Sequence, residues 1–330
     1  MTTLVDTFGR AITYMRISVT DRCNLRCVYC LPDQGVALKA HDDMLTYEEI
    51  TAVAGAAARL GVRRIRLTGG EPLVRRGITS LIRMLKALPG IDEVSLTTNG
   101  VLLEEMAPLL AQAGLNRVNV SLDSLDPARY TRVTRGGRVE RVWRGIAAAE
   151  AAGLTPVKIN VVAVRGLNDD ELPALARLTL EHAWHVRIIE LMPVGDPLVW
   201  GEDLPDPRHA YLPLAEIRTI LEPLGLVEEQ STSGAGPART YRLPGAKGSV
   251  GLISPRGEHF CERCNRLRLT ADGFLRPCLL GEREVEVRSA LRRGEPIEPL
   301  LLKAVMLKPE KHELASNHIP TNRWMAEIGG

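Results

Sequence analysis

Aromatic residues are scarce in this chain, and it has neither a long apolar run nor a strong excess of one charge. Aromatics make up 4% of the 330 residues, which argues against the stacking platforms that bind single-stranded nucleic acid. The net charge is only +2, so no overall field draws the chain to nucleic acid or to a membrane. No stretch approaches the roughly 18 apolar residues of a membrane span, and the opening MTTLVDTFGR lacks the apolar core of a signal peptide. We therefore expect a cytoplasmic protein with no nucleic-acid partner and no membrane partner.

Cysteine is also sparse, but the six cysteines form two groups of three. The first group has the spacing C-x3-C-x2-C, and the second is a C-x2-C pair followed, after thirteen residues, by a third cysteine. The two groups are Cys23, Cys27 and Cys30, and Cys261, Cys264 and Cys278. In a reducing cytosol thiols are more often ligands than disulfides. Because metal centres of this kind normally take four ligands, each group predicts a centre with one open position.

The spacing of the first group favours an iron–sulfur cluster. Three soft thiolates select iron–sulfur clusters, zinc or copper(I), and zinc sites are usually built from separate C-x2-C pairs. A ferredoxin-type carrier supplies four thiolates to each cluster, so three predict a [4Fe–4S] cluster with one free iron. For the second group, a zinc site that adds His259 to the three cysteines stays an alternative.

Strand and helix patterns alternate six times along the chain. The expected strands are 13–19, 64–68, 93–98, 117–123, 157–162 and 186–191. The expected helices are 47–60, 77–88, 102–113, 139–152, 169–182 and 214–224. Alternating β and α units predict a parallel sheet with right-handed crossovers, and therefore an α/β fold.

The strands have one polar face. Asn119 and Ser121 alternate with apolar neighbours, as do Lys158 and Asn160, and alternate side chains of a strand point to opposite faces. A complete barrel packs its lumen with branched apolar residues. We therefore predict a partial (βα)6 TIM-type barrel over residues 1–224, with a polar ligand in its lumen. Residues 225–330 would form a smaller region that carries the second cysteine group and covers one end. A doubly wound open sheet is the alternative.

Two motifs resemble those of the radical S-adenosylmethionine (radical SAM) enzymes. The run CNLRCVYC follows the first strand, and Gly69-Gly70-Glu71-Pro72 follows the second. The resemblance implies a [4Fe–4S] cluster whose free iron is chelated by SAM, with the GGEP segment facing the methionine end of SAM.

Over nearly the whole chain, the sequence is similar to one family of these enzymes, the GTP 3′,8-cyclases of molybdenum cofactor biosynthesis (the MoaA family). The matching motifs are MRISVTDRCN, RLTGGEP, LTTNG, NVSLD, VKINVV, IELMPVG, FCERCNRLRLTADG and the final Gly329-Gly330. The resemblance implies a lyase that uses two [4Fe–4S] clusters and SAM. Its substrate would be GTP and its product (8S)-3′,8-cyclo-7,8-dihydroguanosine 5′-triphosphate.

The resemblance also implies roles for individual residues. Those implied for the SAM site are Tyr29, Gly70, Ser121 and Met192. Those implied for GTP are Arg16, Arg66, Thr97, Lys158, Arg266, Leu267 and Arg268. Arg266 and Arg268, with Gly329 and Gly330, are the implied catalytic residues, and the open iron of the second cluster would face the guanine. The polar strand faces independently place several of these cations in the lumen, where they would clamp a triphosphate; Arg64 and Arg187 lie on the same faces, and whether they join the clamp is left open.

The resemblance further implies an external electron donor and a downstream enzyme that forms a cyclic pyranopterin. The oligomeric state is left open, a homodimer included. Two other functions are weighed against this one: a radical SAM enzyme that modifies a peptide, and a non-catalytic regulatory protein that binds zinc or iron.

Overall fold

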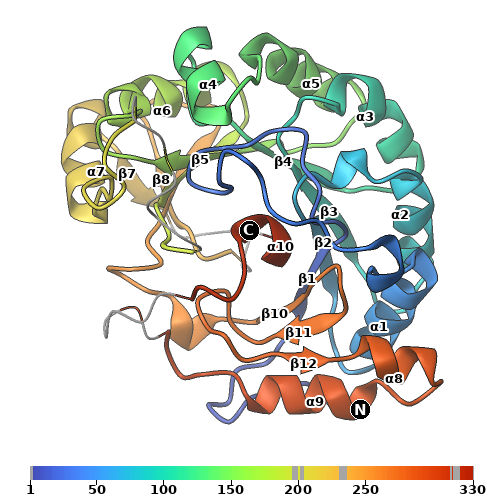
Figure 1. The fold of residues 1–330 in the computed structure, drawn as a ribbon. Helices are drawn as coiled ribbons and strands as arrows, with labels where there is room; N and C mark the ends of the chain where they lie inside the picture. Colours follow the sequence, from blue (N-terminus) through green and yellow to red (C-terminus); the bar gives the residue numbers. More distant parts are fainter. Residues whose placement is uncertain are drawn as a thin grey trace.

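The six predicted strand–helix units are present, and their strands lie in chain order across one sheet (Figure 1). The structure is a computed structural model that describes residues 3–194, 200, 204–229, 236–312, 314 and 320–329. The strands are β1 (Tyr14–Ser18), β2 (Arg64–Thr68), β3 (Glu93–Thr98), β4 (Arg117–Ser121), β5 (Lys158–Ala163) and β6 (His185–Glu190). All five pairings among them are parallel, which confirms the predicted α/β fold.

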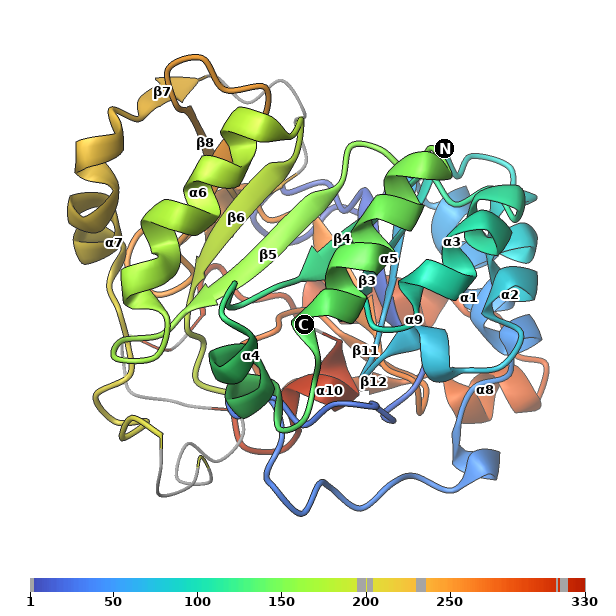
Figure 2. The same ribbon diagram turned by 90° about the horizontal axis from the view of Figure 1, so that it is seen from above.

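Helices cover the outside of this sheet. The six predicted ones are α1 (Tyr47–Arg59), α2 (Ile78–Lys86), α3 (Leu103–Gln112), α5 (Val139–Ala151), α6 (Leu172–Glu181) and α7 (Leu214–Leu221). One further helix, α4 (Pro127–Thr134), precedes α5 and was not predicted. Figure 2 shows α5 and α6 on the outer side of β4, β5 and β6. None of the helices in the described ranges is long and apolar enough to cross a membrane.

Local sequence explains the first helix. Thr46 accepts a hydrogen bond from the Glu49 amide, and the Glu49 carboxylate accepts one from the Thr46 amide, which is the predicted capping box. The helix ends before Gly61, whose φ of +98° lies in the left-handed region.

The region after α7 extends the sheet at both edges, which the sequence did not predict. Its strands are β7 (Val227–Glu229), β8 (Arg239–Arg242), β9 (Ser249–Ile253), β10 (Arg266–Leu269), β11 (Phe274–Arg276) and β12 (Val285–Glu286). β10 pairs in parallel with β1, and β9 pairs in parallel with β6. The expectation of a region that only covers one end was therefore incomplete, because β9 and β10 continue the barrel wall. The described strands run in the order β12-β11-β10-β1-β2-β3-β4-β5-β6-β9-β8-β7, so the barrel stays open.

Three more helices complete the described chain: α8 (Arg288–Arg292), α9 (Glu298–Met306) and α10 (Met325–Ile328). Figure 1 shows α10 near the centre of the ring that the strands form.

The predicted alternation sets the two faces of the sheet. Ile17, Leu67, Val120 and Ile188 are fully buried in the core cluster under the outer helices. Their polar neighbours on each strand face the lumen. The pairing register places Arg16 beside Arg66 on one side and beside Arg268 on the other, so three cations lie at one level.

Candidate active site

The first cysteine group lies in the loop after β1, at the carboxyl end of the strands. Its three cysteines line a cavity of about 180 Å³. The end of α4 holds this loop, because the Arg26 amide donates to the Thr134 carbonyl and the Val28 amide donates to the Val133 carbonyl. All four residues expected at the SAM site line the same cavity: Tyr29, Gly70, Ser121 and Met192.

The GGEP segment packs directly against the cysteine loop. A Cβ atom on Gly70 would lie 2.3 Å from the Arg22 carbonyl oxygen, so only glycine fits there. The Glu71 carboxylate is buried, which raises its pKa to about 7, and it accepts hydrogen bonds from Thr98 and from the Asn99 amide. The segment thus joins the end of β2 to the loop after β3.

A hydrogen bond ties the cysteine loop to the far side of the cavity. The Tyr29 hydroxyl donates to the Asp123 carboxylate at 2.5 Å, and the Val162 amide donates to the same carboxylate at 2.8 Å. Burial raises the pKa of Asp123 to about 6. Asp123 therefore positions Tyr29 between the ends of β4 and β5, a role the sequence did not single out although NVSLD contains this residue.

The chemistry of the first group fits a cluster. Burial raises the pKa of Cys23 and Cys27, and that of Cys30 to about 12, so bare thiolates are unfavourable there and a cationic centre is needed to deprotonate them. The three cysteines of this loop could supply thiolates to a [4Fe–4S] cluster once such a centre binds.

The second cysteine group lines a cavity of about 150 Å³ together with His259, Arg266 and Arg268. Burial alone would raise the pKa of Cys264, but the cations of Arg266 and Lys308 hold it at about 6. Burial raises the pKa of Cys261, opposed by the backbone amide of His312. The lowered pKa favours the thiolate form of Cys264, which is the form that binds a metal centre.

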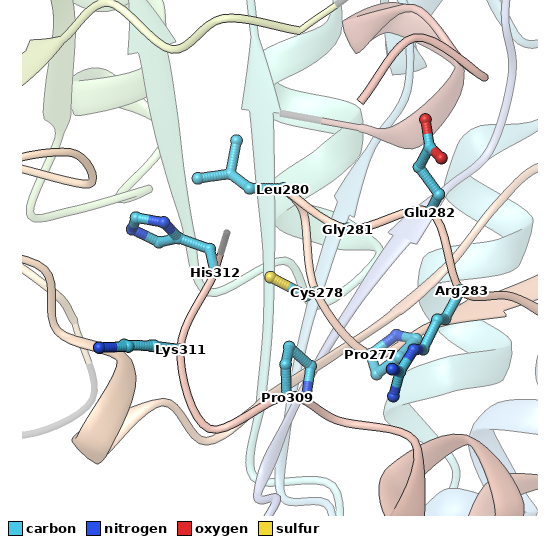
Figure 3. Close-up of a pocket in the computed structure, with 9 residues that line it drawn as sticks. All are labelled: Pro277, Cys278, Leu280, Gly281, Glu282, Arg283, Pro309, Lys311 and His312. Carbon is cyan, nitrogen blue, oxygen red and sulfur yellow. The ribbon is translucent and has the colours of Figure 1, made fainter. Parts of the chain in front are cut away.

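Cys278 also lines a neighbouring cavity of about 230 Å³ (Figure 3). Its walls include the exposed side chains of Arg283 and Lys311 and the buried ring of His312. Cys278 thus lies between this cavity and the lumen.

A basic cavity of about 430 Å³ occupies the lumen between β1 and β6. The cations that line it are Arg16, Arg64, Arg66, Arg117, Lys158, Arg187 and Arg266. The carboxylate in its wall belongs to Glu93, which pairs with Arg117. Burial, followed by the repulsion of neighbouring cations, lowers the pKa of Lys158 to about 6. The cavity therefore holds more positive charge than its own residues compensate, which fits a polyanion.

Several polar atoms in the lumen have no hydrogen-bond partner although they are buried. They are Tyr14 Oη, Arg16 Nε, Thr97 Oγ1, Arg117 Nη1, both side-chain atoms of Asn119, and Asn160 Oδ1. Buried polar groups in native proteins are nearly always paired, so this group indicates a polar ligand.

The segment 320–329 enters the lumen from the second cysteine region. The Arg268 guanidinium donates to the Gly329 carbonyl. A Cβ atom on Gly329 would lie 2.4 Å from Cγ2 of Thr68, and the φ of Gly329 is +78°. The space and the backbone both require glycine. Gly330, the other predicted residue of the pair, lies outside the described residues.

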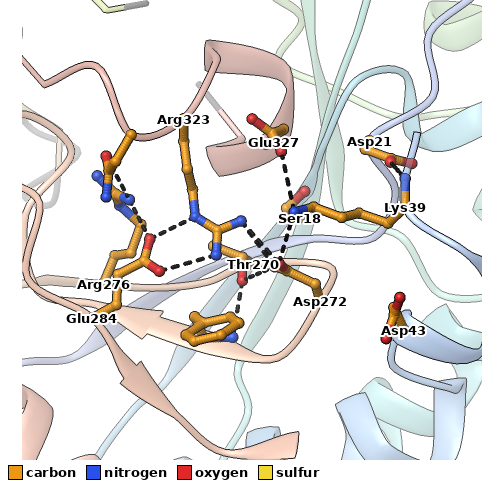
Figure 4. A network of polar contacts seen from close by, with 12 residues as sticks. Ser18, Asp21, Lys39, Asp43, Thr270, Asp272, Arg276, Glu284, Arg323 and Glu327 are labelled. Atoms are coloured by element: carbon orange, nitrogen blue, oxygen red, sulfur yellow. Dashed lines mark hydrogen bonds and ion pairs between the residues drawn. The ribbon is translucent and has the colours of Figure 1, made fainter. Parts of the chain in front are cut away.

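A buried ion-pair network holds this segment (Figure 4). The Arg323 guanidinium donates to both oxygens of Asp272 at 3.0 Å and to both oxygens of Glu284 at 2.6 and 3.0 Å. Arg276, itself buried, also pairs with Glu284. The ammonium nitrogen of Lys39 lies 3.8 Å from a carboxylate oxygen of Glu327 on α10. The network connects the turn after β10 and the segment before β12 to α10.

The structure separates some residues that the sequence grouped. Thr97 lines the first cysteine cavity and not the basic one. Leu267 lies in the hydrophobic core, so its side chain does not line the site cavities. Arg64 and Arg187 both line the basic cavity. Tyr14 and Arg117 line it as well and were missed, although each lies on the polar face of its strand, and that alternation could have found them.

Comparisons with known proteins identify the family. The family model described as "Radical SAM superfamily" matches residues 17–179, and "Molybdenum Cofactor Synthesis C" matches residues 184–314. The GTP 3′,8-cyclase of Pelotomaculum thermopropionicum is 50% identical over 330 residues, covering 98% of this chain and 99% of the relative. That of Moorella thermoacetica is 51% identical over 331 residues, with the same coverage.

Solved structures share the fold. A structure of histidine-tagged anSMEcpe with bound AdoMet superposes with a TM-score of 0.57 at 14% identity, covering 96% of this chain and 84% of that chain. Streptococcus suis SuiB bound to S-adenosylmethionine superposes with a TM-score of 0.58 at 15% identity, covering 85% of this chain and 64% of SuiB. This chain therefore spans less than two thirds of SuiB, and identities this low establish the fold alone.

Proposed function

Since this chain belongs to the GTP 3′,8-cyclase family of radical SAM enzymes, we propose that it converts GTP into (8S)-3′,8-cyclo-7,8-dihydroguanosine 5′-triphosphate in molybdenum cofactor biosynthesis. The observation that carries the proposal is a basic cavity that adjoins two cavities, each lined by three cysteines. This supports a nucleotide substrate over the alternatives of a peptide substrate and a non-catalytic zinc protein.

Cys23, Cys27 and Cys30 would hold the first [4Fe–4S] cluster, and SAM would occupy the cavity beside it. When bound, the cluster and SAM supply the radical that removes hydrogen from C3′ of GTP. The protein itself would position SAM and enclose it in this cavity. Tyr29, fixed by Asp123, and the close backbone at Gly70 shape the SAM cavity, and Ser121 and Met192 line it.

Cys261, Cys264 and Cys278 would hold a second cluster that faces the guanine. Arg266 and Arg268 lie on the lumen face of β10 and line the cavity that these cysteines share. They would hold the guanine end of GTP, with Leu267 contributing only its backbone.

The triphosphate would bind in the basic cavity. Arg16, Arg66 and Lys158 line it. The uncompensated charge of the two arginines, joined by that of Lys158 when a bound phosphate favours its protonation, supports a charge-assisted clamp. Arg64 and Arg187 would join this clamp from the same wall. The buried, unpaired Thr97 hydroxyl would meet the nucleotide on the SAM side.

The segment ending in Gly329 and Gly330 would close the lumen. The hydrogen bond from Arg268 to the Gly329 carbonyl supports this, because it holds the arginine and the segment together beside the second cysteine cavity.

An external reductant would supply the electron, and a downstream enzyme would convert the product to a cyclic pyranopterin. Residues 1–224 and 225–330 would form the two functional parts, and a homodimer is one assembly left open.

Cysteine substitutions test the separate roles proposed for the two cysteine groups. After anaerobic reconstitution we expect about eight irons per chain and matching sulfide in the wild type, and about four in Cys27→Ala and in Cys278→Ala. Cys27→Ala should lose SAM cleavage, whereas Cys278→Ala should still cleave SAM but form no cyclised nucleotide. Two zinc ions per chain without sulfide would contradict the proposal.

A further inference from the structure

Asn160, on β5, lies where the cavities of the lumen meet. It lines the basic cavity, the first cysteine cavity and the second cysteine cavity. Within the described ranges, one other residue, Ile189, lines all three. Because Ile189 is apolar, Asn160 provides the hydrogen-bonding side chain that the three cavities share.

The amide oxygen of Asn160 is buried and has no hydrogen-bond partner. Asn168, nearby in sequence, shows what a purely structural asparagine does: its side chain accepts from the Val164 amide and donates to the carbonyls of Asp123 and Val162. A buried acceptor without a donor is unfavourable in a folded protein. The Asn160 oxygen is therefore suited to accept a hydrogen bond from a bound ligand.

The position of Asn160 along the strand indicates which part of a nucleotide it meets. Lys158, two residues earlier on the same face and about 7 Å away along the strand, lines the basic cavity. Across the pairing register, Asn160 lies between Ser121, in the SAM cavity, and Arg187, in the basic cavity. A nucleotide with phosphates beside Lys158 and its base at the second cysteine cavity brings its sugar to Asn160.

We propose that Asn160 is a positioning residue that accepts a hydrogen bond from a ribose hydroxyl and so favours ribonucleotides over their deoxy analogues. This inference rests on the proposed function. The hydroxyl groups are the hydrogen-bond donors of a ribose. By fixing the sugar at the junction, the hydrogen bond directs C3′ toward the SAM cavity, so its loss should misalign the sugar more than it weakens the phosphate clamp.

The test combines a change in the protein with a change in the ligand. The anaerobically reconstituted wild type, Asn160→Ala, Asn160→Leu and Ile189→Val are titrated with GTP, 2′-deoxy-GTP and 3′-deoxy-GTP. We expect the wild type to bind at least one deoxy analogue roughly tenfold more weakly than GTP, as one lost hydrogen bond predicts. Both Asn160 variants should bind that analogue as tightly as GTP. Ile189→Val alters packing at the same junction without touching a hydrogen bond, and it should keep the wild-type ratio.

A second readout separates positioning from general damage. In both Asn160 variants the ratio of 5′-deoxyadenosine to cyclised nucleotide should rise, with the iron content unchanged. An unchanged preference for GTP over both analogues in the Asn160 variants, or no such preference in the wild type, would overturn the inference alone. Failure of the wild type to bind GTP would overturn the proposed function, and this inference with it.

Discussion

GTP binding should be coupled to proton uptake by Lys158, and Lys158→Met should remove that coupling. Burial, followed by repulsion from Arg187 and Arg117, lowers the pKa of Lys158 from 10.5 to about 6. At pH 8 the empty site therefore holds a neutral lysine. A bound triphosphate beside the side chain favours the ammonium form and raises this pKa again.

The free energy of this protonation follows from the difference between the pH and the pKa of Lys158. At pH 8, protonating a group of pKa about 6 costs about 3 kcal/mol, which binding must supply. GTP affinity should therefore be highest below pH 6, where Lys158 is already charged. Above pH 6, affinity falls by up to tenfold per pH unit until the pH reaches the pKa of the complex.

Calorimetric titration with GTP at pH 8, in two buffers with different ionisation enthalpies, measures the protons taken up. We expect the wild type to take up about one proton more than Lys158→Met. Lys158→Arg is the matched control, because it keeps the charge and should bind GTP without this uptake. SAM cleavage should survive in Lys158→Met. Equal proton uptake by the wild type and Lys158→Met would refute the reasoning, as would unchanged GTP affinity in Lys158→Met.

Three further predictions concern the remaining lumen and the segment at its end. Gly329→Ala should lower cyclised product at least tenfold while SAM cleavage continues, because the new methyl group would lie 2.4 Å from Thr68; Gly153→Ala has a similar positive φ but open space and should leave both products unchanged. Arg323→Met should cost about 3–5 kcal/mol of unfolding free energy, since the buried Asp272 carboxylate loses the arginine that donates to both of its oxygens, while Glu284 keeps only Arg276. Amide exchange in residues 325–329 should accelerate, and protection equal to wild type would contradict this. Without nucleotide, the stability of the wild type relative to Lys158→Met should rise from pH 6 to 10.5, because the unfolded chain binds the Lys158 proton over that range; thermal melts of the two proteins that differ by a constant amount across this range would contradict this.

The strand faces explain how much of the site could be predicted. Alternation within a strand depends only on local geometry, so the polar faces at Arg66 and Lys158 indicated a basic lumen before any contact was known. The same rule would have found Tyr14 and Arg117. The bounds of β2 and β3 match the predicted ones, because apolar residues and turn signals flank both strands.

Other features depend on contacts between distant parts of the chain. β9 and β10 join β6 and β1 as parallel partners, and nothing in their short runs specifies an edge of the sheet. The pairing of Arg323 with Asp272 and Glu284 joins segments that have no shared motif. The role proposed for Asn160 depends on where three cavities meet, which no single strand pattern encodes.

The most direct measurement of the central claim is an anaerobic assay of the reconstituted protein with GTP, SAM and a strong reductant. The account predicts 5′-deoxyadenosine and a cyclised nucleotide formed together, both dependent on Cys27, with the nucleotide alone lost in Cys278→Ala. Formation of 5′-deoxyadenosine with GTP recovered unchanged by the wild type would contradict it.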